Sequence, residues 1–145
     1  MSVRAAALLL LLAASSSCRQ EIAIDTRAAE GIPAKIAIAG LRDLLPKAVY
    51  LSCGEPRVEI SQSEVTSWTV DEKGVELRTK LQATYRLAFS TMRGADLAKL
   101  PLSYQLRVFV QTPKDPHKEF IHLHWRDEES ARRALELFEA LREDR

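Results

Sequence analysis

The sequence is short of the residues on which several common kinds of functional site depend. Its 145 residues include only two cysteines and five glycines. Two cysteines cannot form a four-cysteine zinc site or a disulfide framework, and five glycines leave little material for a glycine-rich phosphate loop. The sequence also has no large excess of positive or negative residues, because 21 Lys and Arg balance 20 Asp and Glu. A net charge of +1 excludes a strongly basic nucleic-acid-binding protein.

The sequence also lacks the motifs of several familiar enzymes. It contains no HExxH, no CxxC, no nucleophile elbow and no P-loop pattern. Its content of 46% hydrophobic and 28% charged residues is that of an ordinary folded domain. We therefore predict a protein without catalytic function and without a bound cofactor.

The N-terminus, MSVRAAALLLLLAASSSC, has the parts of an export signal. Arg4 supplies a basic start, an apolar run extends from Ala5 to Ala14, and three serines follow. The run is shorter than the roughly 20 apolar residues that a bilayer-spanning helix needs. We predict that residues 1–17 are a signal peptide.

Ser16 and Ser17, followed by Cys18, resemble the lipobox of bacterial lipoproteins. The resemblance implies that Cys18 is acylated and becomes the first residue of the mature chain. Arg19, as a residue other than Asp after the cysteine, then implies the outer membrane, facing the periplasm. The expected partners are the membrane, through the lipid anchor, and another protein of the cell envelope. More than one acyl chain is needed for stable anchoring.

Cleavage by the ordinary signal peptidase near Ser15 is the alternative. Cys18 would then remain a thiol that could pair with Cys53 in an oxidising compartment. If Cys18 is acylated instead, Cys53 is left alone, and a lone cysteine is typically a small buried hydrophobic residue. A thiol hydrolase that uses Cys53 is a further alternative function.

The end of the chain predicts an amphipathic helix over residues 127–143. Its apolar residues recur at the three-and-four spacing of a helix. They are Ala131, Ala134, Leu135, Phe138 and Leu141. Asp127 is a suitable N-cap, and Glu128 and Glu129 follow it at the positive end of the helix dipole.

Two hairpins precede this helix. In the later one, the aliphatic residues must share one face, which pairs Val108 with Ile121 and Leu106 with Leu123. The opposite face then carries Phe109 beside Phe120, and Arg107 near His122. In the earlier hairpin, Trp68 and Val70 face Val75 and Leu77 across the turn 71–74. Apolar residues at odd positions from Leu81 to Phe89 predict a further half-buried strand.

Residues 35–52, KIAIAGLRDLLPKAVYLS, fit either one helix that begins near Pro33 or a strand, a turn and a second strand. A loosely similar order occurs between Tyr85 and Leu106. Each stretch has an alternating apolar piece, a short helical turn with leucines, a proline and another β-prone piece. This likeness favours strand, turn and strand in both places.

Together these elements predict an α+β fold. We expect residues 34–145 to form one domain, with an antiparallel sheet or bent barrel of about seven strands packed by the C-terminal helix. Residues 18–33 are expected to be a tether. The element order resembles the pleckstrin-homology-like superfold, although fold alone does not define function.

His122 and His124 are weak candidates for metal ligands. Residues two apart on a strand point to the same face, and paired imidazoles of this kind can hold zinc or copper. A closed site needs a further ligand, but His117 lies in the turn and Glu119 lies on the other face by parity. We therefore favour two solvent-facing histidines without a metal, and keep a metal-binding protein as an alternative function.

The face opposite the aliphatic residues is a candidate partner surface. It would present Arg107, Phe109, Phe120, His122 and His124. Aromatic residues and arginine are enriched at contact surfaces, so this face favours a non-catalytic binding or scaffolding module of the cell envelope. Alternatively, residues 19–45 fold over this face and make it a second core layer.

Overall fold

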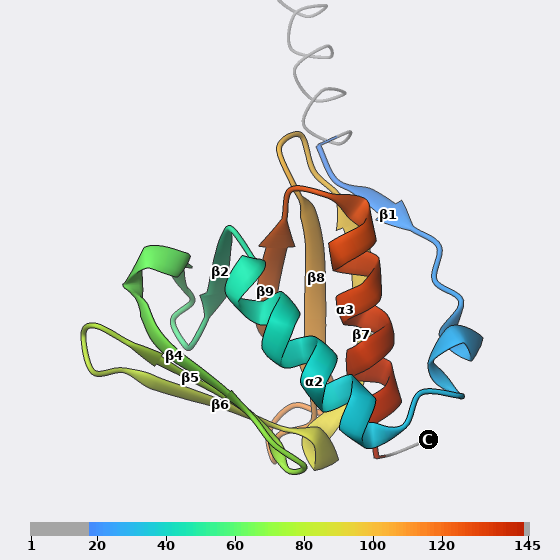
Figure 1. The fold of residues 1–145 in the computed structure, drawn as a ribbon. Coiled ribbons are helices and arrows are strands. Elements are labelled where there is room, and N and C mark those ends of the chain that lie inside the picture. Colours follow the sequence, from blue (N-terminus) through green and yellow to red (C-terminus); the bar gives the residue numbers. More distant parts are fainter. Residues whose placement is uncertain (1–17, 144–145) are drawn as a thin grey trace, which may run out of the picture.

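Nine strands form two antiparallel sheets in the computed structural model, which describes residues 18–143 (Figure 1). The six-stranded sheet has the order β1 (Gln20–Ile22), β7 (Met92–Lys99), β8 (Tyr104–Val110), β9 (Lys118–Trp125), β2 (Tyr50–Cys53), β3 (Val58–Ser61). The three-stranded sheet has the order β4 (Val65–Val70), β5 (Gly74–Thr79), β6 (Thr84–Ala88). The α+β class is confirmed, with two open sheets in place of a barrel. The predicted signal peptide lies outside the described residues.

The predicted C-terminal helix is present as α3 (Glu128–Leu141). Asp127 caps it, because its carboxylate accepts a hydrogen bond from the Ser130 N–H at 2.9 Å. All five residues of the predicted apolar stripe are buried. The helix packs against β7, β8 and β9 and thereby covers one face of the larger sheet (Figure 1).

Residues 34–44 form a helix, α2 (Ala34–Leu44), so the predicted strand there is wrong. The buried residues Ala37, Ile38 and Leu41 follow helical spacing, and this stripe packs on α3 and on β4. Gly40 permits the close approach of the two helices, since an added Cβ would lie 2.6 Å from Leu137 Cδ1. The chain then passes through a 3-10 turn (Leu45–Lys47) into β2, so the second predicted strand of this stretch is present.

The leucine-containing turn expected after Phe89 is also absent. After a 3-10 turn (Phe89–Thr91), the residues Met92–Lys99 form β7, which lies between β1 and β8. Leu97 is buried on the helix-covered face, where it lies opposite Leu106. Pairing with strands on both sides therefore overrides the local resemblance to residues 35–52.

The predicted register of both hairpins is confirmed at its aliphatic positions. Val108 lies opposite Ile121, Leu106 opposite Leu123, and Trp68 opposite Leu77. A β-bulge then shifts the pairing of β8 with β9, so that Phe109 lies opposite Glu119 and not beside Phe120. The strict alternation used to place Glu119 and Phe120 therefore fails at this point.

Residues 18–33 are not a free tether. β1 pairs with β7 at the edge of the larger sheet, with Gln20 opposite Lys99 and Ile22 opposite Leu97. A 3-10 turn (Thr26–Ala29) follows and contacts α3, and Ala29 is buried. Cys18 is exposed, and β1 begins two residues after it.

Candidate functional site

The side of the six-stranded sheet opposite α3 carries a polar surface, which we call the open face. Its side chains come from neighbouring strands at matched register positions. They are Tyr50, Ser52, Asp96, Gln105, Arg107, Phe109, Glu119, His122 and His124. Four of the five residues predicted for the partner surface lie here.

Arg107 is the centre of an ion-pair network on the open face. Its guanidinium donates to both carboxylate oxygens of Asp96, at 2.8 and 2.5 Å, and to Glu119 Oε1 at 3.1 Å. Two-pronged pairing of this kind holds a guanidinium in one orientation. Arg19 extends the network, because it bonds to Gln105 and lies 3.3 Å from Asp96. Arg107 is therefore a half-buried structural group as well as a surface charge.

His122 is held between two partners of this network. Its Nε2 donates to Glu119 Oε2 at 3.0 Å, and Gln105 Nε2 donates to its Nδ1 at 3.5 Å. Burial lowers the pKa of His122 below its usual value, with a further contribution from the nearby Arg57, although Glu119 opposes this shift. At neutral pH the imidazole is therefore neutral and acts as a hydrogen-bonded link.

His124 is almost fully buried, with 4% of its surface exposed. Its ring stacks on Tyr50 at a centroid distance of 4.0 Å, and its Nδ1 lies 3.1 Å from Ser103 Oγ in a hydrogen bond. Burial lowers the pKa of His124 to about 4, and the neighbouring His122 contributes to the shift. His124 is thus a neutral packed group, and the expectation of a solvent-facing side chain is wrong.

Phe109 and Tyr50 are the partly exposed aromatic residues of the open face, and Phe109 is the one next to Arg107. It is partly exposed, stacks on His117 at a centroid distance of 4.4 Å, and lies under the Arg107 guanidinium at 5.4 Å. Phe120, in contrast, packs against the core beside Trp68 and Tyr85, because the bulge turns it to the other side of the sheet. Phe120 is therefore removed from the candidate partner surface.

Cys53 is separated from the histidines by the sheet itself. It is fully buried on the helix-covered face, whereas its neighbour Ser52 lies opposite His122 on the open face. Burial raises the pKa of the Cys53 thiol to about 11, which disfavours the reactive thiolate. The structure therefore does not assemble a Cys–His pair.

Metal-binding geometry is likewise not assembled in the part of the chain that the structure describes. Among residues 18–143, no group of three His, Cys, Asp or Glu side chains is arranged to hold a metal ion. The bulge does bring Glu119 to the histidine face, but there it accepts hydrogen bonds from His122 and Arg107. His122 and His124 share a face, as predicted, and each has a protein partner.

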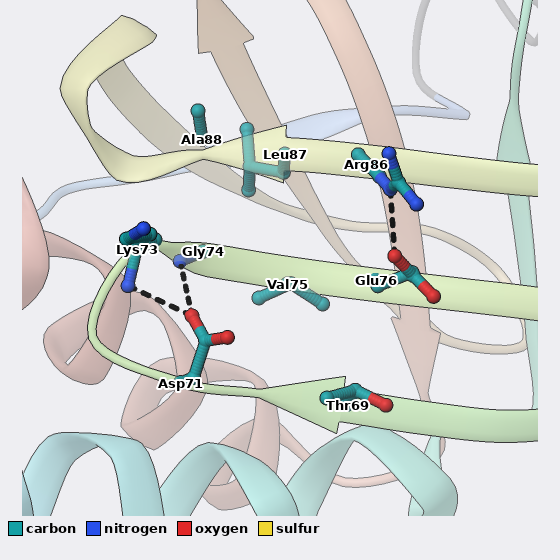
Figure 2. Close-up of a pocket in the computed structure, with 9 residues that line it drawn as sticks. All are labelled: Thr69, Asp71, Lys73, Gly74, Val75, Glu76, Arg86, Leu87 and Ala88. Atoms are coloured by element: carbon teal, nitrogen blue, oxygen red, sulfur yellow. Dashed lines mark hydrogen bonds and ion pairs between the residues drawn. The ribbon is translucent and has the colours of Figure 1, made fainter.

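A shallow hollow of about 240 Å³ lies on the three-stranded sheet, away from the open face. Figure 2 shows its lining residues, in which Asp71 accepts hydrogen bonds from the backbone N–H groups of Lys73 and Gly74. Glu76 pairs with Arg86 at 2.6 Å. These charged side chains form hydrogen bonds within the β-turn and an ion pair between strands. None of the site residues predicted from the sequence lies in this hollow.

No known protein family, curated protein or solved structure matches the chain. The resemblances to lipoproteins and to the pleckstrin-homology-like superfold therefore stay predictions. Within residues 18–143, no helix combines the length and apolar composition needed to cross a bilayer.

Sequence reasoning did not find Asp96, Gln105 or Arg19 as parts of the open face. The signal for Asp96 and Arg19 is the register of β7 and β1, neither of which is predicted as a strand. Gln105 lies two residues before Arg107 on β8, so its place on this face follows from parity. Once Asp96 is set opposite Arg107, the ion pair follows from cross-strand charge complementarity.

Proposed function

We propose that the chain is a lipid-anchored protein of the bacterial cell envelope, with Cys18 as the acylated residue. Its β-rich domain would be a non-catalytic binding or scaffolding module facing the periplasm from the outer membrane. The observation that carries the proposal is the apolar run from Ala5 to Ala14, which is followed by three serines and Cys18. The exposure of Cys18 supports it, since the residue is accessible to modifying enzymes.

The mass of the mature protein, extracted from the membranes of cells that make it, tests the anchor. We expect a chain that begins at Cys18 and carries acyl chains. The variant Cys18→Ser is expected to lose the acyl mass and to leave the membrane fraction almost completely. Cys53→Ala is the matched control, because it removes the other cysteine and should leave both acylation and fractionation unchanged. An unmodified N-terminus at Ser16 would overturn the proposal.

The binding surface of this module is proposed to be the part of the open face around Phe109, with His117 and Arg107. A partly exposed aromatic pair beside a positioned guanidinium combines the residue types that are enriched at interfaces. The Arg107 network would hold these groups in place before a partner arrives, which reduces the entropy cost of binding.

A photoreactive amino acid at position 109 tests this surface in living cells. We expect irradiation to give a discrete adduct with an envelope protein, identified by mass spectrometry. The same amino acid in place of Thr69, which is exposed on the other sheet, should give no such adduct. Equal adducts from both positions, or none from position 109, would contradict the assignment. Arg107 is less suitable as a probe, because its substitution also removes the ion pairs.

A further inference from the structure

The pairing of β1 with β7 places Cys18 beside one particular turn. Gln20 lies opposite Lys99, and the two strands are antiparallel, so the chain before Gln20 lies next to the residues after Lys99. Those residues, 100–103, form the turn between β7 and β8, here called the β7–β8 turn. Figure 1 shows this turn and the start of β1 at the same end of the molecule.

The β7–β8 turn exposes a large apolar side chain at its tip. Leu102 is 91% exposed, and Pro101 beside it is also exposed. Large apolar side chains with this degree of exposure are few in the described chain: the other is Leu81, at 93%, in the turn between β5 and β6. That turn belongs to the other sheet and lies on the far side of the molecule from β1 (Figure 1).

The exposure of Leu102 is built into a closed turn. The Leu100 N–H donates to the Ser103 carbonyl oxygen at 2.8 Å. Ser103 is buried, and its hydroxyl is hydrogen-bonded to the packed ring of His124. The base of the turn is therefore fixed to the sheet, so Leu102 cannot withdraw into the core without breaking these contacts.

The charges around the turn are suited to a headgroup layer. Lys99 precedes the turn, and Arg126 follows β9 next to it, since Trp125 lies opposite Tyr104. Both are exposed cations. The acids close to these cations have partners of their own. Asp96 accepts a hydrogen bond from Arg107, and Glu21, opposite Ala98 on β1, lies 2.9 Å from Arg19. Asp127 accepts a hydrogen bond from the Ser130 N–H at the start of α3. An apolar tip flanked by exposed cations is the arrangement that an interfacial membrane contact uses.

We propose that the β7–β8 turn is a second membrane contact, in which Leu102 and Pro101 enter the lipid surface beside the acylated Cys18. This inference rests on the proposed function, since the anchor brings the turn to the bilayer. The acyl chains hold the protein on the membrane, and the turn fixes the domain's orientation there. Two contacts close together on one rigid edge define an orientation that a lipid chain alone does not.

The test uses acylated protein whose modification has been verified by mass, in vesicles of phosphatidylethanolamine and phosphatidylglycerol without other proteins. Leu102→Gln is expected to raise the rate of transfer to acceptor vesicles about tenfold, the factor that corresponds to loss of partial burial of one leucine side chain. Leu81→Gln is the matched control and should leave the rate unchanged. Both side chains are exposed, so thermal unfolding should not differ between the variants.

A second measurement reports directly on the position of the turn. Leu102→Cys, labelled with a polarity-sensitive fluorophore, should shift its emission to the blue in these vesicles, whereas labelled Leu81→Cys should not. Verified acylation without a shift at position 102, or equal transfer rates for both glutamine variants, would overturn the inference and leave the anchor intact. A shift that needs an added envelope protein would also overturn it. Absence of the acyl mass would instead refute the proposed function itself.

Discussion

Replacing Arg107 with methionine is expected to lower the free energy of unfolding by about 2 to 3 kcal/mol. The substitution keeps much of the side-chain volume and removes the positive charge. It leaves Asp96 and Glu119, which both pair with Arg107, without their shared cation in a region where Arg107 is only 22% exposed. Removing one partner of a buried pair costs more than the pair contributes, because the charges left behind are partly desolvated. Among residues 18–143, Asp96 then keeps only the longer contact with Arg19, at 3.3 Å, and Glu119 keeps only the hydrogen bond with His122. Because Arg107 is still partly exposed, we expect a loss of unfolding free energy at or below the lower end of the range for fully buried pairs.

Chemical denaturation measures this change, and two variants isolate its cause. Arg86→Met removes a comparable arginine–glutamate pair from the exposed surface in Figure 2, where Glu76 keeps its bond to Arg78. It should not move the unfolding midpoint measurably. The double variant with Arg107→Met and Asp96→Leu should recover part of the loss. An Arg107→Met protein as stable as the parent would show that the network contributes nothing.

Lowering the pH from 7 to 5 is expected to reduce the free energy of unfolding by about 2 kcal/mol. The pKa of His124 falls from 6.5 to about 4 on folding, because its ring is buried. Between these values the unfolded chain binds more protons than the folded one, so stability decreases as the pH falls below about 6.5. The lowered pKa of His122 acts in the same direction.

Carboxylates contribute little to this pH window. Asp71 and Asp127, whose pKa values are lowered by backbone hydrogen bonds, lose their contribution only below about pH 4. His124→Gln should therefore flatten most of the profile between pH 7 and 5, while the parent shows the full decrease. Denaturation at several pH values measures both proteins. A flat profile for the parent, or an equal slope for the variant, would contradict the burial of a neutral His124.

The parts of the fold that could be predicted from the sequence are those in which each element carries its own pattern. The stripe of α3 and its Asp127 cap are local signals, and both are present. The aliphatic alternation of β8 and β9 was sufficient to set Leu106 opposite Leu123. In each case burial of one face selects one arrangement, and the residues that report it lie close together in the chain.

Other parts depend on information that is not local. The alternation in residues 36–39 fits a strand as well as a helix, and only the neighbouring α3 and β4 show which face is buried. The bulge at Glu119 and Phe120 inserts one unpaired residue without any change in composition, so parity failed there. β1 is three residues long and acquires its pairing from β7.

The same distinction applies to the candidate site. Arg107, Phe109 and His122 could be assigned to one face because they follow a single hairpin. Asp96 and Arg19, which hold Arg107 in place, come from strands distant in sequence. The exposure of Leu102 is a property of the turn's packing, and no pattern in the residues around it indicates that the side chain points outward.

The short edge strand β1 also determines the direction in which the open face is oriented. Figure 1 shows that β1 starts at the same end of the molecule as the β7–β8 turn. If Cys18 is the anchor, as proposed, the strands of the larger sheet would point away from the bilayer, and the open face would be directed parallel to the membrane plane. A partner fixed to the same leaflet would meet this face by lateral diffusion. Confinement to one plane raises the effective concentration of such a partner. An interaction too weak to survive purification could still be well occupied on the membrane.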